Sequence, residues 1–324
     1  MLYDSFGRKV NYLRLSVTDR CDLRCVYCMP PEGIPRKPVS EILTYDELLR
    51  TVRVAVSLGV RKVRITGGEP LVRRDIVSFV RWVAQVPGVL DLGMTTNGTA
   101  LPETAAPLKA AGLSRVNVSL DTIRRDRYAE ITRRDSLPRV LSGIEASVRA
   151  GLSPVKINVV LLHGLLPSEV DDFLAMARRI PVKVRFIERM PIGCSPSDAF
   201  VSADGVRERI LSLPGVRELP NGGSSAAVSY VAPGFRGQLG IISPISRKFC
   251  DQCNRIRVTA DGRIRGCLFG RETHDLRGAL RSGRGDAAVA ELFRSAVLAK
   301  PEGHDLCGQG DGPSGAEPMS RVGG

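Results

Sequence analysis

The chain has 324 residues, of which 43% are hydrophobic, and its 47 lysines and arginines outnumber 34 acidic residues to give a formal net charge of +13. This length and composition support a real hydrophobic core, in one large α/β domain with or without a smaller one. No apolar run opens the chain or reaches transmembrane length, which excludes a signal peptide and a membrane span and predicts a cytoplasmic protein with no membrane partner.

The positive charge calls for an anionic partner. Nucleic acid is one candidate, and a polyphosphate substrate drawn into an arginine-lined cavity is another. Only 5% of the residues are aromatic, whereas RNA-binding surfaces interleave basic clusters with exposed aromatic side chains. We therefore expect no nucleic-acid partner.

Short apolar segments alternate with helical patterns as far as about residue 190. The predicted strands are residues 12–17, 63–66, 89–94, 115–120, 155–160 and 182–187. The predicted helices between them are residues 45–58, 75–84, 102–111, 137–150 and 168–179. Several of these helices end at a glycine, as a helix C-terminus often does. Repeated βα units predict a parallel sheet, and six of them suit an open or partial barrel.

Unusual polar sequence follows most of these strands at their carboxyl ends. It comprises residues 18–28, 66–70, 95–98, 119–121 and 188–191. Parallel α/β sheets place their ligand sites at this edge. Loops are polar in any protein, so the pattern predicts a site without naming its chemistry.

After residue 190 the βα rhythm is lost and glycine, proline and serine become dense. Further strands are predicted at residues 227–231, 238–242 and 256–259, and a helix at residues 287–298. We predict a barrel domain over residues 1–190, a smaller C-terminal domain over residues 191–307 and a glycine-rich tail over residues 308–324.

Three cysteines within eight residues, Cys21, Cys25 and Cys28, form the first cysteine group. A disulfide framework cannot use thiols this close together, and a tetrahedral zinc site would need a fourth ligand. An iron-sulfur cluster tolerates one iron without a thiolate. The spacing C-x3-C-x2-C, with Tyr27 before the last cysteine, resembles the signature of the radical S-adenosylmethionine (SAM) enzymes. A zinc knuckle that lacks one ligand is the alternative.

Cys250, Cys253 and Cys267 form the second cysteine group, with the spacing C-x2-C-x13-C. It too has three thiols and no obvious fourth ligand. His274 lies seven residues beyond Cys267 and could complete a zinc site. Both metals therefore stay open for this group when it is considered alone.

Together, the two cysteine groups, residues 249–269 and the C-terminal Gly323-Gly324 resemble the GTP 3',8-cyclase family (molybdenum cofactor biosynthesis protein A) of the radical SAM superfamily. The resemblance runs from residue 3 to residue 324. It implies an incomplete (βα)6 radical SAM barrel with a smaller C-terminal domain that carries a second iron-sulfur cluster. It also implies a lyase that cyclises GTP to (8S)-3',8-cyclo-7,8-dihydroguanosine 5'-triphosphate, the first step of molybdenum cofactor biosynthesis.

The resemblance implies two 4Fe-4S clusters, one on each cysteine group, of which the first binds SAM and the second binds the guanine of GTP. The positions that match SAM contacts are Tyr27, Gly68, Ser119 and Met190. The positions that match GTP contacts are Arg14, Lys62, Arg64, Thr95, Lys156, Arg255 and Arg257. Arg185 matches a position tied to the reaction, and Gly323 and Gly324 match a tail that reaches the active site. From the residues alone, strand cations would usually lie at an outer edge and Thr95 or Ser119 would be a capping hydroxyl.

The family further implies a homodimer, an electron donor such as flavodoxin or ferredoxin, and a downstream cyclic pyranopterin monophosphate synthase. A rival enzyme is a radical SAM maturase with auxiliary clusters that acts on peptides or RNA, although such modules usually carry more cysteines. A rival without catalysis is a zinc-stabilised, basic nucleic-acid-binding protein, which leaves the polar edge of the sheet unexplained. No role is assigned to Cys194, Cys307, His163 or His304.

Overall fold

The computed structural model of the protein describes residues 1–192, 200–220, 226–270, 273–304 and 319–322. Its central parallel strands are β3 (Tyr12–Ser16), β4 (Lys62–Thr66), β5 (Asp91–Thr96), β6 (Arg115–Ser119), β7 (Val155–Leu161) and β8 (Val182–Glu188). Each pairs in parallel with the next in chain order. All of the strands predicted for the barrel are confirmed, with small shifts at their ends.

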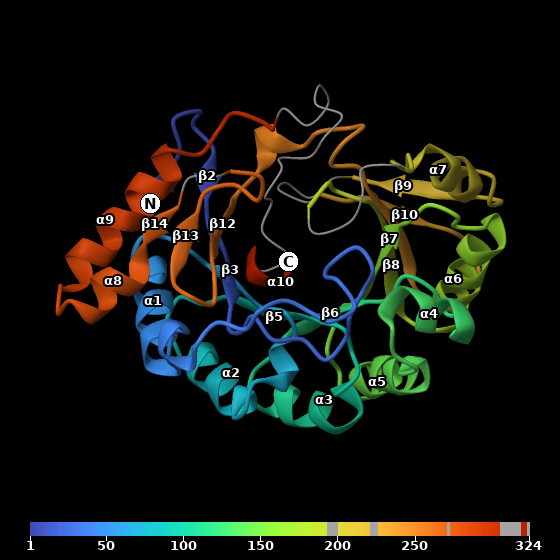
Figure 1. Ribbon diagram of the computed structural model, residues 1–324. Helices are drawn as coiled ribbons and strands as arrows, with labels where there is room; N and C mark the ends of the chain where they lie inside the picture. The colour runs from blue at the N-terminus through green and yellow to red at the C-terminus, as the bar shows by residue number, and fades with distance from the viewer. Residues whose placement is uncertain (193–199, 221–225, 271–272, 305–318, 323–324) are drawn as a thin grey trace.

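Helices connect these strands and lie on the outer side of the curved sheet (Figure 1). The helices that the sequence predicts are confirmed as α1 (Tyr45–Ser57), α2 (Ile76–Ala84), α3 (Leu101–Ala110), α5 (Leu137–Arg149) and α6 (Pro167–Arg179). A capping box of Thr44 and Glu47 starts α1. Gly59 follows α1 at φ 103°, a conformation that favours glycine. The sequence analysis missed α4 (Arg125–Thr132), whose residues are mostly polar.

Alternating burial along β7 and β8 shows what the sheet encloses. Val155, Ile157 and Val159 are fully buried in the core beneath the helices. Lys156 and Asn158, between them, are half-buried and point to the other face. A parallel sheet with apolar layers on both faces would have continuous apolar strands. The inner face of this sheet is therefore polar, and the barrel interior is a place for charged groups.

The chain after β8 extends the same sheet at both edges. It forms α7 (Asp204–Leu211), β9 (Arg217–Leu219), β10 (Val228–Val231), β11 (Gln238–Ile242), β12 (Arg255–Val258), β13 (Arg263–Arg265), β14 (His274–Asp275), α8 (Leu276–Arg281), α9 (Asp286–Leu298) and α10 (Met319–Val322). β11 pairs in parallel with β8, and β12 pairs in parallel with β3. In the described part of the chain, twelve strands thus form one sheet.

The predicted C-terminal strands and helix are confirmed as β10, β11, β12 and α9. The short elements α7, β9, β13, β14 and α8 were not predicted, nor was the N-terminal hairpin of β1 (Leu2–Tyr3) and β2 (Lys9–Val10). The boundaries of the barrel, the C-terminal domain and the tail stay predictions. None of the helices among the described residues is long and apolar enough to cross a lipid bilayer.

Glu188 fastens the C-terminal region to the end of β8. Its side chain is fully buried. The carboxylate accepts hydrogen bonds from the backbone N–H groups of Ala203 at 3.2 Å, Ile245 at 3.1 Å and Ser246 at 3.0 Å, and from the Ser246 hydroxyl. One side chain thereby fixes two segments that follow the barrel.

Replacement of Glu188 by alanine leaves three backbone N–H groups without their acceptor, of which that of Ala203 is buried and those of Ile245 and Ser246 are partly buried. We expect Glu188→Ala to lower the free energy of unfolding by about 3 kcal/mol or more, since each unsatisfied buried donor costs about 1–3 kcal/mol. Urea denaturation followed by circular dichroism measures this change. Glu208→Ala, at an exposed position on α7, is the matched control and should stay near the wild-type value. Equal stability of the two variants contradicts the assigned role of Glu188.

Candidate functional site

The first cysteine group follows β3 in a loop that rests on α4. The backbone N–H of Arg24 donates to Thr132 O, at the end of α4, over 3.0 Å. Arg133, which has a φ of 55°, donates from Nη1 to the carbonyls of Arg24 and Met29, each at 2.9 Å. The helix that the sequence analysis missed therefore shapes the loop that carries the three thiols.

The thiols of this loop have strongly shifted acidities. Burial, with the nearby Glu69 carboxylate, raises the pKa of Cys21 to about 12. Burial also raises the pKa of Cys25 well above its ordinary value, and Cys28 and Cys21 add to that rise. Thiols in such surroundings stay protonated at neutral pH unless the positive charge of bound metal replaces the proton. The grouping of the three thiols fits a metal cluster.

Tyr27 connects this loop to the ends of β6 and β7. Its hydroxyl donates to Asp121 Oδ2 over 2.7 Å, and Asp121 Oδ1 accepts from the backbone N–H of Val160 over 2.8 Å. Burial raises the pKa of Asp121 to about 6 despite these two hydrogen bonds. The ring of Tyr27 is thereby fixed next to two of the cysteines.

A second carboxylate network holds the loop that follows β4. Glu69 accepts from Thr96 Oγ1 over 2.7 Å, from Asn97 N over 2.6 Å and from Leu71 N over 2.9 Å. Burial raises the pKa of Glu69 to about 7. Asn97 Nδ2 also donates to Asp22 Oδ1 over 2.6 Å. The ends of β4 and β5 and the first cysteine group are therefore held together by side chains.

Gly68 packs directly against the start of the cysteine loop. A Cβ atom at this position would lie 2.4 Å from Arg20 O and 3.0 Å from Asp19 O. Gly67 is similarly tight, at 2.7 Å from Thr18 O. The protein's own packing thus requires glycine at 68. Ser119, at the end of β6, and Met190, just after β8, are half-buried at the same edge of the sheet.

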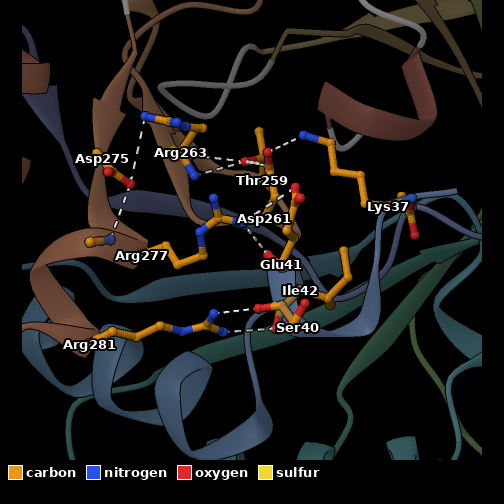
Figure 2. Close-up of polar contacts among 12 residues, drawn as sticks. Lys37, Ser40, Glu41, Ile42, Thr259, Asp261, Arg263, Asp275, Arg277 and Arg281 are labelled. Atoms are coloured by element: carbon orange, nitrogen blue, oxygen red, sulfur yellow. Dashed lines mark hydrogen bonds and ion pairs between the residues drawn. The ribbon is translucent and has the colours of Figure 1, made fainter.

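Figure 2 shows polar contacts between residues 37–42, which follow the first cysteine loop in the chain, and the region of β12, β13, β14 and α8. Lys37 forms an ion pair with Asp261, which lies in the turn between β12 and β13. The backbone N–H of Lys37 donates to Asp19 Oδ2 over 3.0 Å. Burial favours a raised pKa for Asp261, but Lys37 and the Thr259 hydroxyl outweigh it and hold that pKa below its ordinary value. One lysine therefore links the approaches to both cysteine groups.

Basic side chains line neighbouring strands on the inner face of the sheet. Arg14 of β3 lies in register with Arg64 of β4 on one side and Arg257 of β12 on the other. Lys156 of β7 lies across from Asn117, which in turn lies across from Thr95. Of the residues predicted to contact GTP, the remaining two are Lys62 and Arg255, each in register with Tyr12.

We call the basic side chains on this inner face the cationic band: Arg14, Lys62, Arg64, Lys156, Arg185, Arg255 and Arg257. The pKa shifts of several members show that they lie close together. Burial lowers the pKa of Lys156 to about 7, and the charges of Arg185, Arg115 and Arg64 contribute. Burial and Arg64 lower the pKa of Arg185 to about 9. Burial lowers the pKa of Arg14 well below its ordinary value, and Arg257 contributes to that shift. So many basic side chains in one interior favour the binding of a polyanion.

Two buried polar atoms in this band await a partner. Thr95 Oγ1 and Asn117 Oδ1 have no hydrogen-bond partner among the described residues. Buried polar groups are nearly always hydrogen-bonded. Asn117 lies across from Lys156, and Thr95 lies across from Asn117. A polar ligand bound here would supply the missing hydrogen bonds. Arg185, by contrast, is oriented within the protein, because its Nε donates to Asn158 Oδ1 over 3.0 Å.

The second cysteine group lies at the amino end of β12, because Cys253 stands two residues before that strand and Cys267 two residues after the antiparallel strand β13. Burial works to raise the pKa of Cys253, but the charges of Lys300 and Arg255 outweigh it and lower that pKa. The guanidinium of Arg255 lies over the ring of Phe249, with its carbon atom 5.2 Å from the ring centroid. Cys253 and Cys267 both act on the pKa of Arg257, which burial lowers to about 10. The cationic band therefore ends at this group.

The zinc alternative finds no matching site. His274 lies in β14, paired in register with Ile264. Among the described residues, no three His, Cys, Asp or Glu side chains are arranged to hold a single metal ion. These residues include all six cysteines of the two groups as well as His274. A cluster of several irons spaces its ligands more widely than one ion does.

Several residues of this region were missed from the sequence. Tyr12 accepts a hydrogen bond from Arg64 Nε over 2.6 Å, and although burial acts to raise the pKa of Tyr12, the charges of Arg64 and Arg14 lower it to about 7. Its alternation with Arg14 along β3 was the available signal. Asp121 stood within a polar segment noted at the sheet edge. Cys194, Cys307, Gly323 and Gly324 lie outside the described residues.

Comparison with known proteins identifies the family. The model of the radical SAM superfamily matches residues 15–177, and that of Molybdenum Cofactor Synthesis C matches residues 182–306. The GTP 3',8-cyclase of Moorella thermoacetica is 43% identical over 326 residues, with 100% of both chains covered. The chain belongs to the GTP 3',8-cyclase family. The Molybdenum cofactor biosynthesis protein 1 of Drosophila melanogaster is 44% identical over 94% of this chain and 54% of its own length.

The predicted fold of this cyclase-family member is also confirmed. The crystal structure of Streptococcus suis SuiB bound to S-adenosylmethionine matches with a TM-score of 0.59 at 15% sequence identity, over 89% of this chain and 66% of the other. Such a low identity supports the shared radical SAM fold alone. Membership of the superfamily implies a 4Fe-4S cluster and SAM as cofactors.

A test of the glycine packing follows for this family member. We expect Gly68→Ala to retain clearly less iron per chain after anaerobic reconstitution, because the new Cβ must displace the backbone at Arg20, next to Cys21. Iron and sulfide analysis of the purified protein measures the loss. Gly205→Ala is the control, because a Cβ at Gly205 meets nothing within 4 Å. Wild-type iron content in Gly68→Ala contradicts this account of the loop.

Proposed function

We propose that the protein cyclises GTP to 3',8-cyclo-7,8-dihydroguanosine 5'-triphosphate in a radical SAM reaction, the first step of molybdenum cofactor biosynthesis. The full-length similarity to GTP 3',8-cyclases carries this proposal. The cationic band between the two cysteine groups supports it, because it offers a triphosphate several positive charges in one interior.

We propose that the first cysteine group holds the 4Fe-4S cluster of the superfamily. Tyr27, Gly68, Ser119 and Met190 would contact SAM beside it. When reduced, such a cluster supplies the electron that splits SAM into methionine and a 5'-deoxyadenosyl radical. The protein's part is to orient SAM, and the fixed ring of Tyr27 and the tight turn at Gly68 support that role.

GTP would lie along the cationic band. Its proposed contacts are Arg14, Lys62, Arg64, Thr95, Lys156, Arg255 and Arg257. The triphosphate would offset the mutual repulsion of the arginines, and the unpartnered Thr95 hydroxyl would complete its hydrogen bonding. Arg185 would act during the reaction, where Asn158 holds its guanidinium in place.

We further propose that the second cysteine group holds a second 4Fe-4S cluster. The guanine would bind at its iron without a thiolate. The grouping of the three thiols supports this assignment, and Lys300, whose ammonium lies 3.3 Å from Cys253 Sγ, would stabilise that ligand as a thiolate. Because the cationic band ends at this group, the phosphates of GTP would contact the band while the guanine reaches the second cysteine group.

The remaining parts of the proposal concern partners and location. We propose that the enzyme works in the cytoplasm, where a reducing environment keeps cluster cysteines free of disulfides. We also propose that the protein forms a homodimer, receives electrons from a donor such as flavodoxin or ferredoxin, and passes its product to a downstream cyclic pyranopterin monophosphate synthase. The tail with Gly323 and Gly324 would reach the site. Support comes from α10, whose Val322 is buried and whose Arg321 Nη2 donates to Pro35 O over 2.8 Å.

The decisive test is an anaerobic assay of the reconstituted protein with dithionite and SAM, with and without GTP. We expect 5'-deoxyadenosine that depends on GTP, together with a cyclised isomer of GTP, both measured by chromatography and mass spectrometry. Cys21→Ser should abolish both products. Deoxyadenosine that forms regardless of GTP, with GTP recovered intact, would keep the superfamily assignment and refute the substrate.

The lowered pKa of Lys156 predicts a pH dependence of GTP binding. The free protein loses the lysine's charge as pH rises through about 7, whereas a bound triphosphate would raise that pKa and hold the proton. GTP affinity should therefore be level below about pH 7 and fall above it, by at most about tenfold per pH unit for one proton. Isothermal titration calorimetry between pH 6.5 and 9 measures this slope.

Lys156→Arg is the matched variant for this experiment. Arginine keeps its charge over the tested range, so the slope between pH 7 and 9 should be shallower than that of the wild type. Lys156→Met should bind GTP more weakly at pH 7 and should have a shallower slope than the wild type, the remaining slope coming from Tyr12, whose pKa is also lowered to about 7. A wild-type affinity that does not change over this range refutes the assignment of Lys156 to the phosphates.

A further inference from the structure

The five residues after α9 and its C-cap, Lys300 to His304, wrap around the second cysteine group. Lys300 is only 4% exposed. Its ammonium lies 3.3 Å from Cys253 Sγ and donates to Gly266 O over 3.0 Å. A buried lysine needs a counter-charge or complete hydrogen bonding. Within the described residues Lys300 has no carboxylate partner, so the sulfur of Cys253 takes that place.

Gly266 makes this approach possible. A Cβ atom at Gly266 would lie 2.5 Å from Ala296 O and 3.4 Å from Lys300 Cα. The absence of a side chain lets the end of α9 press against the strand that leads to Cys267. The lysine is thereby aimed at Cys253, 47 residues away in sequence.

The same segment gives a hydrogen bond to a second cysteine. The backbone N–H of His304 donates to Cys250 Sγ. The His304 ring is held in place by a hydrogen bond between Nε2 and Pro244 O at 2.8 Å and by contact with the Phe269 ring, whose centroid lies 4.8 Å away. Two of the three thiols therefore have donors from this segment.

Arg8 anchors the segment from the other end of the chain. Its Nη1 donates to Cys250 O over 2.7 Å and to Glu302 O over 2.6 Å, and its Nη2 donates to Pro301 O over 2.6 Å. Asp4 accepts from Arg8 Nε over 2.6 Å and so orients the guanidinium. The position of Lys300 is thus fixed by its backbone as well as by its own contacts.

Charge and hydrogen bonds at the ligand sulfurs are the means by which a protein sets the reduction potential of an iron-sulfur cluster. Three thiolates give a 4Fe-4S cluster a net negative charge, which grows on reduction. A fixed ammonium beside one thiolate favours the reduced state. We propose that Lys300 is a positioning residue that raises the reduction potential of a cluster on the second cysteine group, an inference that rests on the second cluster of the proposed function.

The test is an electron paramagnetic resonance redox titration of the reconstituted enzyme without substrate. In Lys300→Met the second cluster should be about tenfold harder to reduce, a downward shift of its midpoint potential by about 60 mV for one electron. The midpoint of the first cluster should not move. Full-length protein with Cys21, Cys25 and Cys28 all changed to alanine, with and without Lys300→Met, assigns the signals.

Two variants control for charge and for folding. Lys300→Arg keeps the positive charge and should restore most of the potential. Arg294→Met removes an equal charge from an exposed position on α9 and should leave the potential unchanged. If Lys300→Met fails to hold iron at the second group, Lys300→Gln provides the measurement in its place.

The outcomes separate this inference from the function on which it rests. A wild-type enzyme with about eight irons per chain, whose second midpoint is the same in Lys300→Met or its glutamine substitute, overturns the role of Lys300 alone. A wild-type enzyme with about four irons per chain, all lost with the first cysteine group, refutes the second cluster and the inference together. A shift equal to that of Arg294→Met also overturns the specific role of Lys300.

Discussion

The mutual repulsion of buried cations inside the barrel is the constraint on which the rest of the structure depends. Arg14, Arg64 and Arg185 lie on the inner face of one sheet, where water is scarce and charges interact strongly. The outer face of the same strands contributes apolar side chains to the core, so the fold is stabilised on one side and strained electrostatically on the other. A polyanionic substrate offsets that repulsion, so substrate binding also stabilises the interior of the barrel.

The two cysteine groups have different electrostatic surroundings. The first depends on carboxylates. Asp22 lies within the cysteine loop, Glu69 follows β4 and Asp121 follows β6, and their hydrogen bonds fix the loop. The second is surrounded by cations, of which Lys300 reaches Cys253 and Arg8 reaches the carbonyl of Cys250. Negative surroundings make a cluster harder to reduce and positive surroundings make it easier. The chain thereby gives two similar sets of thiols different electrostatic environments.

Much of the fold could be predicted because its signals are local. Apolar runs separated by amphipathic helices and glycines predicted the strands and most helices of the barrel, and the cysteine spacings predicted both groups. α4 was missed because its sequence is mostly polar and only Tyr128, Ile131 and Thr132 are buried. The approach of Lys300 to Cys253 could not be predicted, since it depends on the packing of α9 against Gly266. Contacts between distant segments leave no periodic pattern in the sequence.

The continuity of the sheet explains how two cysteine groups far apart in sequence are placed relative to one substrate. β12 follows Cys253 almost at once and pairs with β3, which runs into the first cysteine loop. Arg257 of β12 and Arg14 of β3 therefore lie side by side through strand register. The two strands are neighbours in the sheet (Figure 1). Lys37, Asp19 and Asp261 add a second connection between the same regions. A ligand that spans the cationic band meets both ends at distances that the backbone hydrogen bonds of the sheet determine.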